Sequence, residues 1–227
     1  MSEYNPFDEY GSYASPHRTR RDGTVVNGPS ARVGTGIGLA FGYVATIWMV
    51  HIINFGVFGG ALNAFGVHPL DLASLWHIFT SPLLHGSWAH LWANTVPGAI
   101  FCFLIGLSGA RVFWEVTAIS CVLGGLGTWF FGGVGTTHIG ASGLIYGWLA
   151  YLIIRGIFNR SLVQVVLGVV LAFVYGGLVW GVFPVEAGVS WQGHLFGAIG
   201  GIVSGAVITS DDPPALKARR EQKRLQR

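Results

Sequence analysis

Charged residues are scarce in this sequence of 227 residues, of which only 10% are Asp, Glu, Lys or Arg while 52% are hydrophobic. A soluble domain of ordinary composition carries about 25% charged residues. The deficit leaves too little polar surface to face water, so the sequence predicts a protein that is dissolved in a lipid bilayer. Glycine is abundant instead, with 35 residues, which in a membrane protein indicates helices packed backbone to backbone.

Motifs for metals and disulfides are also missing. Cys102 and Cys121 lie inside apolar runs and form no CxxC pair, so we expect two small buried side chains and no disulfide or zinc site. The sequence has no HExxH motif, which disfavours a zinc metalloprotease, and no metal or other cofactor is expected. A net charge of +3 is weak evidence for nucleic-acid binding, and we expect none.

Six apolar stretches occupy most of the chain, and each is close to the length that crosses a hydrocarbon core of about 30 Å. The predicted fold is therefore an all-α membrane protein with six transmembrane helices in residues 34–210. The stretches run over 35–58, 88–108, 112–131, 141–158, 162–182 and 191–209. The polar residues 1–33 are expected to form a disordered tail, and residues 211–227 a basic tail that could lie on anionic lipid.

The basic residues are sorted to one side of this topology. Six spans place both tails on the same side, and that side holds all 13 Lys and Arg residues. The opposite connections, 59–87, 132–140 and 183–190, contain none. By the positive-inside rule we expect both termini in the cytoplasm of a multi-pass protein, with the bacterial plasma membrane as its location. The long, aromatic connection 59–87 is expected to fold back on the membrane surface.

Polar side chains inside the spans are costly and mark function by default. Ser142 opens the fourth span and His194 opens the sixth, while His90 and Asn94 lie one turn apart on the second. At about 1.5 Å of rise per residue, Ser142 lies roughly 20 Å, and Asn94 and His194 roughly 25 Å, from the cytoplasmic edge. All four side chains are therefore expected in the outer half of the membrane, close to one level.

Glycines at every fourth position predict close contact between the fourth and sixth spans. They are Gly143 and Gly147 on the fourth span and Gly193, Gly197, Gly201 and Gly205 on the sixth. Two such faces let helix backbones approach closely, which would set His194 beside Ser142. Tyr146 lies four residues after Ser142 on the same face and could pack on the imidazole.

These residue types favour nucleophilic chemistry over simple packing. A lone serine in a membrane helix is usually a packing residue, but a serine becomes a nucleophile when a base such as His194 accepts its proton. Ser142 opens a helix, where free N–H groups and the helix dipole favour developing negative charge. His90 and Asn94 can donate to an oxyanion. No buried Asp is present to orient His194, so the pair would act as a dyad.

In combination these motifs resemble those of the rhomboid family of intramembrane serine proteases. The resemblance covers the six spans, about residues 35–209. The family's motifs read here as His85, His90 and Asn94 on the second span, Gly140, Ser142, Gly143 and Tyr146 on the fourth, and His194, Gly197 and Gly201 on the sixth.

The resemblance implies a compact rhomboid-like bundle and an endopeptidase that cleaves other membrane proteins in or near their transmembrane segments. It implies Ser142 as nucleophile, His194 as general base and acid, and His90 with Asn94 in the oxyanion hole. It also implies a first outer loop that lies in the membrane and a water-filled cavity open to the outside. The partners would be transmembrane protein substrates and the lipid bilayer.

Two alternatives remain open. One is a non-catalytic protein of the same fold that binds or escorts membrane clients, although such a protein would be expected to lack Ser142 or His194. The other is a proton-coupled transporter, which is weakened by the absence of an internal repeat and of a carboxylate in mid-membrane. Many rhomboids have Trp-Arg in the first outer loop, whereas this sequence has Trp76-His77, so the anchoring of that loop is left open.

Overall fold

Helices make up most of the described chain, and their bounds follow the apolar stretches. The computed structural model describes residues 17–19, 25–27, 29–185 and 188–226. The α-helices are α1 (Pro29–Val57), α2 (Trp88–Gly106), α3 (Ala110–Phe131), α4 (Ser142–Asn159), α5 (Leu162–Val174), α6 (Trp191–Val207) and α7 (Pro214–Leu225). The 3-10 helices are η1 (Ala61–Phe65), η2 (Leu72–Ile78), η3 (Ser81–Leu83) and η4 (Gly176–Val182). Two short strands, β1 (His17–Thr19) and β2 (Val25–Asn27), pair antiparallel before α1.

The predicted all-helical fold is confirmed, but length and composition mark fewer than six helices as membrane spans. Helices α1, α2 and α3 are long and apolar enough to cross a membrane, and α5 with η4, bent by 69°, would make a fourth span. Within the described residues, α4 and α6, of 18 and 17 residues, do not meet this standard. Helix α4 packs against α2, α3, α5 and α6. The composition of α4 therefore reflects contact with other helices more than contact with lipid.

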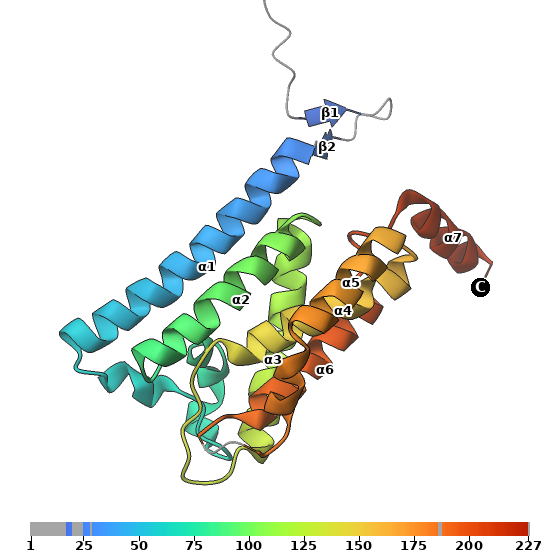
Figure 1. Ribbon diagram of the computed structural model, residues 1–227. Helices are drawn as coiled ribbons and strands as arrows, with labels where there is room; N and C mark the ends of the chain where they lie inside the picture. The colour runs from blue at the N-terminus through green and yellow to red at the C-terminus, as the bar shows by residue number, and fades with distance from the viewer. Residues whose placement is uncertain (1–16, 20–24, 28, 186–187, 227) are drawn as a thin grey trace, which may run out of the picture.

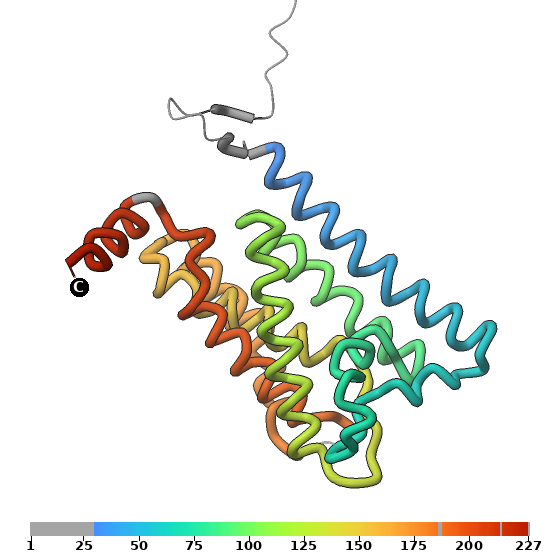
Figure 2. The backbone as a smooth tube through the Cα atoms, turned by 180° about the vertical axis from the view of Figure 1, so that it is seen from behind, coloured from blue at the N-terminus to red at the C-terminus, as the bar shows by residue number. Residues whose placement is uncertain are grey.

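The helices lie side by side in one bundle (Figures 1 and 2). Helix α1 forms one edge and packs on α2, whereas α6 packs against both α3 and α4. Helix α5 covers another side of α4. The start of α1 and the end of α6 lie at the same end of the bundle, and α7 leaves from that end (Figure 1).

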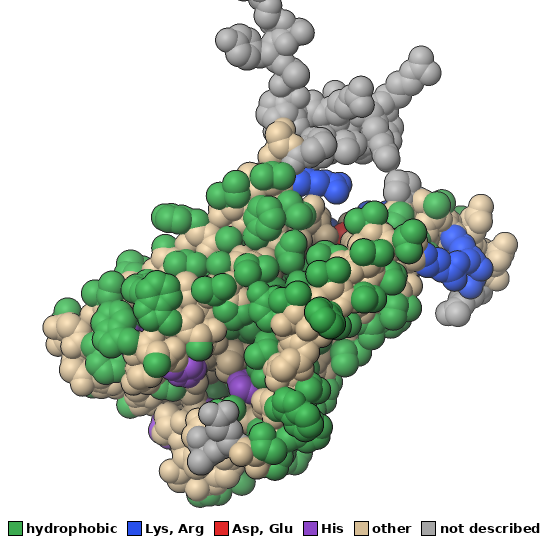
Figure 3. All heavy atoms as spheres, in the orientation of Figure 1, with side chains coloured by type: hydrophobic (Ala, Val, Ile, Leu, Met, Phe, Trp, Pro, Cys, Tyr) green, Lys and Arg blue, Asp and Glu red, His purple; other side chains and the backbone are tan. Residues whose placement is uncertain are grey.

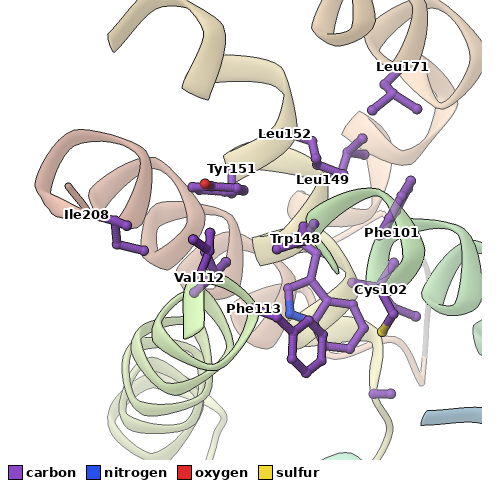
Figure 4. Close-up of a cluster of buried hydrophobic side chains, with 14 residues drawn as sticks. Phe101, Cys102, Val112, Phe113, Trp148, Leu149, Tyr151, Leu152, Leu171 and Ile208 are labelled. Carbon is purple, nitrogen blue, oxygen red and sulfur yellow. The ribbon is translucent and has the colours of Figure 1, made fainter. Parts of the chain in front are cut away.

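Trp148 of α4 occupies the centre of the hydrophobic core (Figure 4). Its side chain is 1% exposed, and its ring lies 5.4 Å from the ring of Tyr43 on α1 and 5.7 Å from that of Phe113 on α3. The indole Nε1–H donates to Thr117 Oγ1 over 3.0 Å, so its polar atom is satisfied. One side chain of α4, the helix that begins with Ser142, thus contacts both α1 and α3.

The segment 59–87 folds back along the bundle through η1, η2 and η3. Val67 pairs with His138 in an isolated antiparallel bridge, and Trp129 Nε1–H of α3 donates to the Asp71 carbonyl over 2.9 Å. Where many rhomboids have Trp-Arg, this chain has Trp76-His77, and the structure shows how His77 anchors the loop. Its Nδ1 lies 2.8 Å from the Gly66 carbonyl. A carbonyl only accepts, so His77 donates this bond and anchors the loop to itself.

Backbone contact joins α4 and α6, as the glycine spacing predicted. A Cβ at Gly197 would overlap the carbonyl of Gly143, and a Cβ at Gly201 would overlap the carbonyl of Gly147. On another side of α6, a Cβ at Gly200 would lie 2.7 Å from the Cα of Ser120 on α3. Helix α6 therefore fits between α3 and α4 because it presents hydrogen where other residues carry a side chain.

The expected tails correspond only in part to described residues. Of the tail predicted over 1–33, residues 1–16, 20–24 and 28 lie outside the described residues, and α1 already begins at Pro29. The expected disorder of this tail stays a prediction. Most of the basic tail 211–227 is the helix α7.

We predict that Gly201→Ala destabilises the fold. The new methyl group would meet the Gly147 carbonyl and the Tyr151 amide nitrogen, which belong to helix backbone and cannot rotate away. Overpacking of this kind typically costs about 1–3 kcal/mol. The thermal unfolding midpoint of the purified protein measures the loss. Gly42→Ala is the matched control, since its Cβ would meet nothing within 4 Å; equal midpoints for both variants would contradict the contact.

Candidate active site

Ser142 is the first residue of α4, and Gly140 sets the turn before it. Gly140 has φ of 121°, a left-handed value that favours glycine, and its N–H donates to the Ser81 carbonyl over 2.9 Å. A Cβ at Gly140 would lie only 2.5 Å from His90 Nε2. The predicted Gly140 is therefore needed for both its backbone angle and the approach of His90 to the start of α4.

His194 of α6 is hydrogen bonded on both ring nitrogens. Nε2 lies 2.7 Å from Ser142 Oγ, and Nδ1 lies 2.9 Å from the carbonyl oxygen of Gly181. Because a carbonyl can only accept, Nδ1 carries the proton and Nε2 presents its lone pair to the serine hydroxyl. A main-chain carbonyl thus selects the tautomer in which His194 can accept a proton from Ser142.

Tyr146 holds the imidazole from its face, as predicted. The two rings are stacked with centroids 4.1 Å apart and planes 6° apart. The Tyr146 hydroxyl donates to the Leu178 carbonyl of η4 over 2.7 Å. A Cβ at Gly181 would overlap the Tyr146 hydroxyl and lie 3.0 Å from His194 Nδ1. Helix η4 therefore reaches the imidazole only because residue 181 is glycine.

His90 and Asn94 line the same cavity as Ser142 and His194. Asn94 is 4% exposed, and its Nδ2 donates to the His90 carbonyl over 2.8 Å, which leaves the second amide hydrogen for another acceptor. His85 is fully buried and packs edge-to-face on His90 with ring centroids 5.0 Å apart. The ring of His85 therefore supports His90 from one side.

A cavity of about 810 Å³ opens over these groups. Its walls come from α2, from the segment 137–146 and from η4 with the segment that follows it. Figure 3 shows histidine side chains inside a hollow on this face of the molecule. The cavity is large enough for a stretch of peptide to reach the Ser142 hydroxyl.

The remaining predicted glycines shape the contact between α4 and α6. A Cβ at Gly143 would lie 3.1 Å from the Gly193 carbonyl, and Gly197 and Gly201 contact α4 farther along α6. They bring the two helices together and do not line the cavity. Within the described residues, no group of three or more His, Cys, Asp or Glu side chains is placed to hold a metal ion.

Two features of the site have no signature in the sequence. One is the Gly181 carbonyl, because every residue carries a carbonyl and only the bend after α5 points this one at His194. The other is His138, whose Nδ1 lies 2.8 Å from Ser190 Oγ and whose Nε2 lies 3.0 Å from the Gly132 carbonyl. His138 thereby joins the loop before Ser142 to the residue before α6.

Comparison with known proteins gives the family of this chain. The family model described as the Rhomboid domain matches residues 72–211, which include all the site residues discussed above. An uncharacterized protein of Mycobacterium tuberculosis is 41% identical to this chain, over 90% of this chain's length and 93% of its own length. One of Mycobacterium leprae is 40% identical over 75% of this chain and 70% of its own. A Bacillus subtilis protein, whose name marks it as a candidate rhomboid protease, is 28% identical over 56% of this chain and 64% of its own.

The chain therefore belongs to the Rhomboid family. Its apolar helices together with this domain make it an integral membrane protein.

We predict that Gly181→Ala disables the imidazole while the fold persists. The added methyl group would displace the Tyr146 hydroxyl or His194, so a fluorophosphonate probe should label Ser142 at least tenfold more slowly. Gly177→Ala is the matched control in the same helix, since its Cβ would meet nothing within 4 Å. Adding Tyr146→Phe to Gly181→Ala removes the overlapping oxygen and should restore part of the rate. Equal labelling of the two single variants would refute this role of Gly181.

Proposed function

We propose that this protein is an intramembrane serine endopeptidase that hydrolyses peptide bonds in or near transmembrane segments of other membrane proteins. The observation that carries the proposal is the hydrogen-bonded chain from Ser142 Oγ through His194 to the Gly181 carbonyl. It supplies a nucleophile, a base of the correct tautomer and a fixed base orientation in one cavity. Membership of the Rhomboid family supports the same reaction.

The reaction follows from these contacts. His194 Nε2 takes the Ser142 proton as Oγ attacks the scissile carbonyl, and the resulting imidazolium gives that proton to the departing amine. The Gly181 carbonyl and the face of Tyr146 stabilise the imidazolium while it exists. Water then hydrolyses the acyl-serine, with His194 acting again as base.

The oxyanion would form between α2 and the start of α4. His90 and Asn94 reach it from α2, and the free backbone N–H groups at the start of α4 face the same charge. Donors of this kind stabilise the oxyanion more than the ground-state carbonyl, and removing one typically lowers the rate by roughly 10²–10³.

The orientation we propose has six spans and both termini in the cytoplasm of a bacterial plasma membrane. The basic residues support it, because Arg111 at the start of α3 and Arg155 and Arg160 near the end of α4 all lie at the end of the bundle from which α7 leaves. Figure 3 shows Lys and Arg side chains gathered at this end, and hydrophobic side chains spread over much of the bundle below it. Helices α4 and α6 can be short because surrounding helices, and not lipid, enclose much of their length.

Client helices would reach the cavity sideways. Ala93 and Pro97 of α2 line one side and Trp180 of η4 lines the other, so the gap between α2 and the bent pair α5–η4 leads to Ser142. Hydrolysis needs an exposed peptide bond, and therefore part of the client helix must unwind on arrival. Small or helix-breaking residues in the client should favour cleavage.

The dyad predicts a specific pattern of loss. Ser142→Ala should abolish cleavage of a transmembrane test substrate and labelling by a fluorophosphonate, and His194→Ala should lower both sharply. The double variant should be no worse than Ser142→Ala, because the two residues act as one unit. Thermal unfolding should show that each variant remains folded, and chelators should change nothing. Cleavage by Ser142→Ala would exclude the serine mechanism, and an unlabelled, inactive wild type would favour a non-catalytic client-binding protein.

The orientation predicts the labelling of single cysteines. Val134, 78% exposed in the loop before Ser142, should react as Val134→Cys with an impermeant thiol reagent from outside intact cells. Ala110→Cys, at the exposed start of α3, is the control and should react only after permeabilisation. The reverse pattern would overturn the proposed topology while leaving the dyad untouched.

A further inference from the structure

We propose that α7 binds the anionic phospholipid headgroups of the membrane that the bundle spans. The helix carries five basic residues and a single acidic one, Glu221. The basic residues are Lys217, Arg219, Arg220, Lys223 and Arg224. All five are exposed, so the helix presents a positive surface of a kind that attracts anionic lipid.

The acidic residues that precede α7 cancel only one of these five charges. Asp211 and Asp212 have side chains that are 5% and 0% exposed, and both are paired with the buried guanidinium of Arg155 on α4. Tyr151 and Asn159 also donate to Asp211. Arg155 balances one of these two carboxylates, and Arg220 of α7 lies beside Asp212 and balances the other. The charge left on α7 is that of Lys217, Arg219, Lys223 and Arg224 against Glu221 alone.

Two contacts with the segment before α7 hold the helix in place. Arg220 Nε lies 3.1 Å from Asp212 Oδ2, and Lys217 Nζ donates to the Ser210 carbonyl over 3.0 Å. Helix α7 runs across the direction of the bundle helices and extends beyond their edge (Figures 1 and 2). A helix held in this way at the end of a membrane bundle lies along the headgroup layer, so the bilayer is the polyanion within its reach.

One side of α7 also suits an interface. The apolar residues Ala215, Ala218 and Leu225 recur at helical spacing on one side, with the uncharged Gln222 between them, and Leu225 is 76% exposed. A helix of 12 residues is marginal in water without packing on one face. The boundary between headgroups and acyl chains offers that packing to the small apolar stripe, while the basic residues remain among the phosphates.

The test uses the full-length protein in nanodiscs, with an environment-sensitive dye on Gln222→Cys. We expect a blue shift in discs that contain phosphatidylglycerol, absent in phosphatidylcholine discs and reversed by high salt. Arg219→Gln/Lys223→Gln/Arg224→Gln keeps the Arg220–Asp212 and Lys217–Ser210 contacts and loses only the exposed Arg224–Glu221 pair within α7. It should lower the docked-to-undocked ratio roughly a hundredfold, at about fivefold per charge. Arg32→Gln/Arg111→Gln/Arg160→Gln removes the same charge from the same end and should keep the shift.

Three outcomes would overturn the proposal. They are identical spectra in the two lipids, an unchanged shift in the α7 variant, and an equal shift when an oligonucleotide is added to phosphatidylcholine discs, which would point to nucleic acid. The inference agrees with the proposed orientation and does not use the proposed activity. Both leaflets of a nanodisc have the same lipid composition, so the spectra do not depend on which way the protein is inserted or on whether it cleaves. The test therefore succeeds or fails separately from both proposals.

Discussion

The contact between the backbones of α4 and α6 is the constraint on which the site depends. Ser142 lies in the first turn of α4 and His194 in the first turn of α6. The hydrogen bond of 2.7 Å between their side chains requires the two helices to touch. Glycines at positions 197 and 201 place hydrogen against the carbonyls of α4, where a methyl group would overlap them. The third neighbour, α3, approaches in the same way at Gly200. Small residues thus supply, in a membrane, the close fit that larger side chains give a soluble core.

In the proposed mechanism the Gly181 carbonyl takes the place of the acid of a serine-histidine-aspartate triad, and the apolar environment gives the reason. An aspartate beside His194 would be a charge taken out of water, and its desolvation would offset much of its attraction for the imidazolium. The Gly181 carbonyl orients the ring and selects its tautomer without carrying charge. Tyr146 links the imidazole to η4, since its ring stacks on His194 while its hydroxyl donates to the Leu178 carbonyl. The bend between α5 and η4 is therefore part of the site.

Arg155 and the two aspartates that follow α6 lie at the other end of the bundle. There Arg155, Asp211 and Asp212 form a buried cluster. Arg155 pairs with both carboxylates and donates to the Gly205 carbonyl, while Tyr151 and Asn159 donate to Asp211. A buried ion pair is weak evidence for added stability, but loss of one partner leaves an uncompensated charge. Because the cluster joins α4 to the chain that follows α6, it ties the helix of Ser142 to the position of α7.

The sequence alone determined that the fold is helical, roughly where its helices lie and that α4 contacts α6, whereas its count of six spans is not confirmed by the length and composition of the helices. Scarce charge and glycine spacing are properties of side chains, and the placing of Ser142 beside His194 and Tyr146 could be predicted from them. The reacting roles of Ser142 and His194 stay a proposal. Only the tertiary structure decided that Gly181 orients His194, that His138 meets Ser190 and that His77 anchors its own loop through Gly66. These partners are carbonyls or depend on loop geometry. Every residue has a carbonyl, so the fold alone decides which one faces an imidazole.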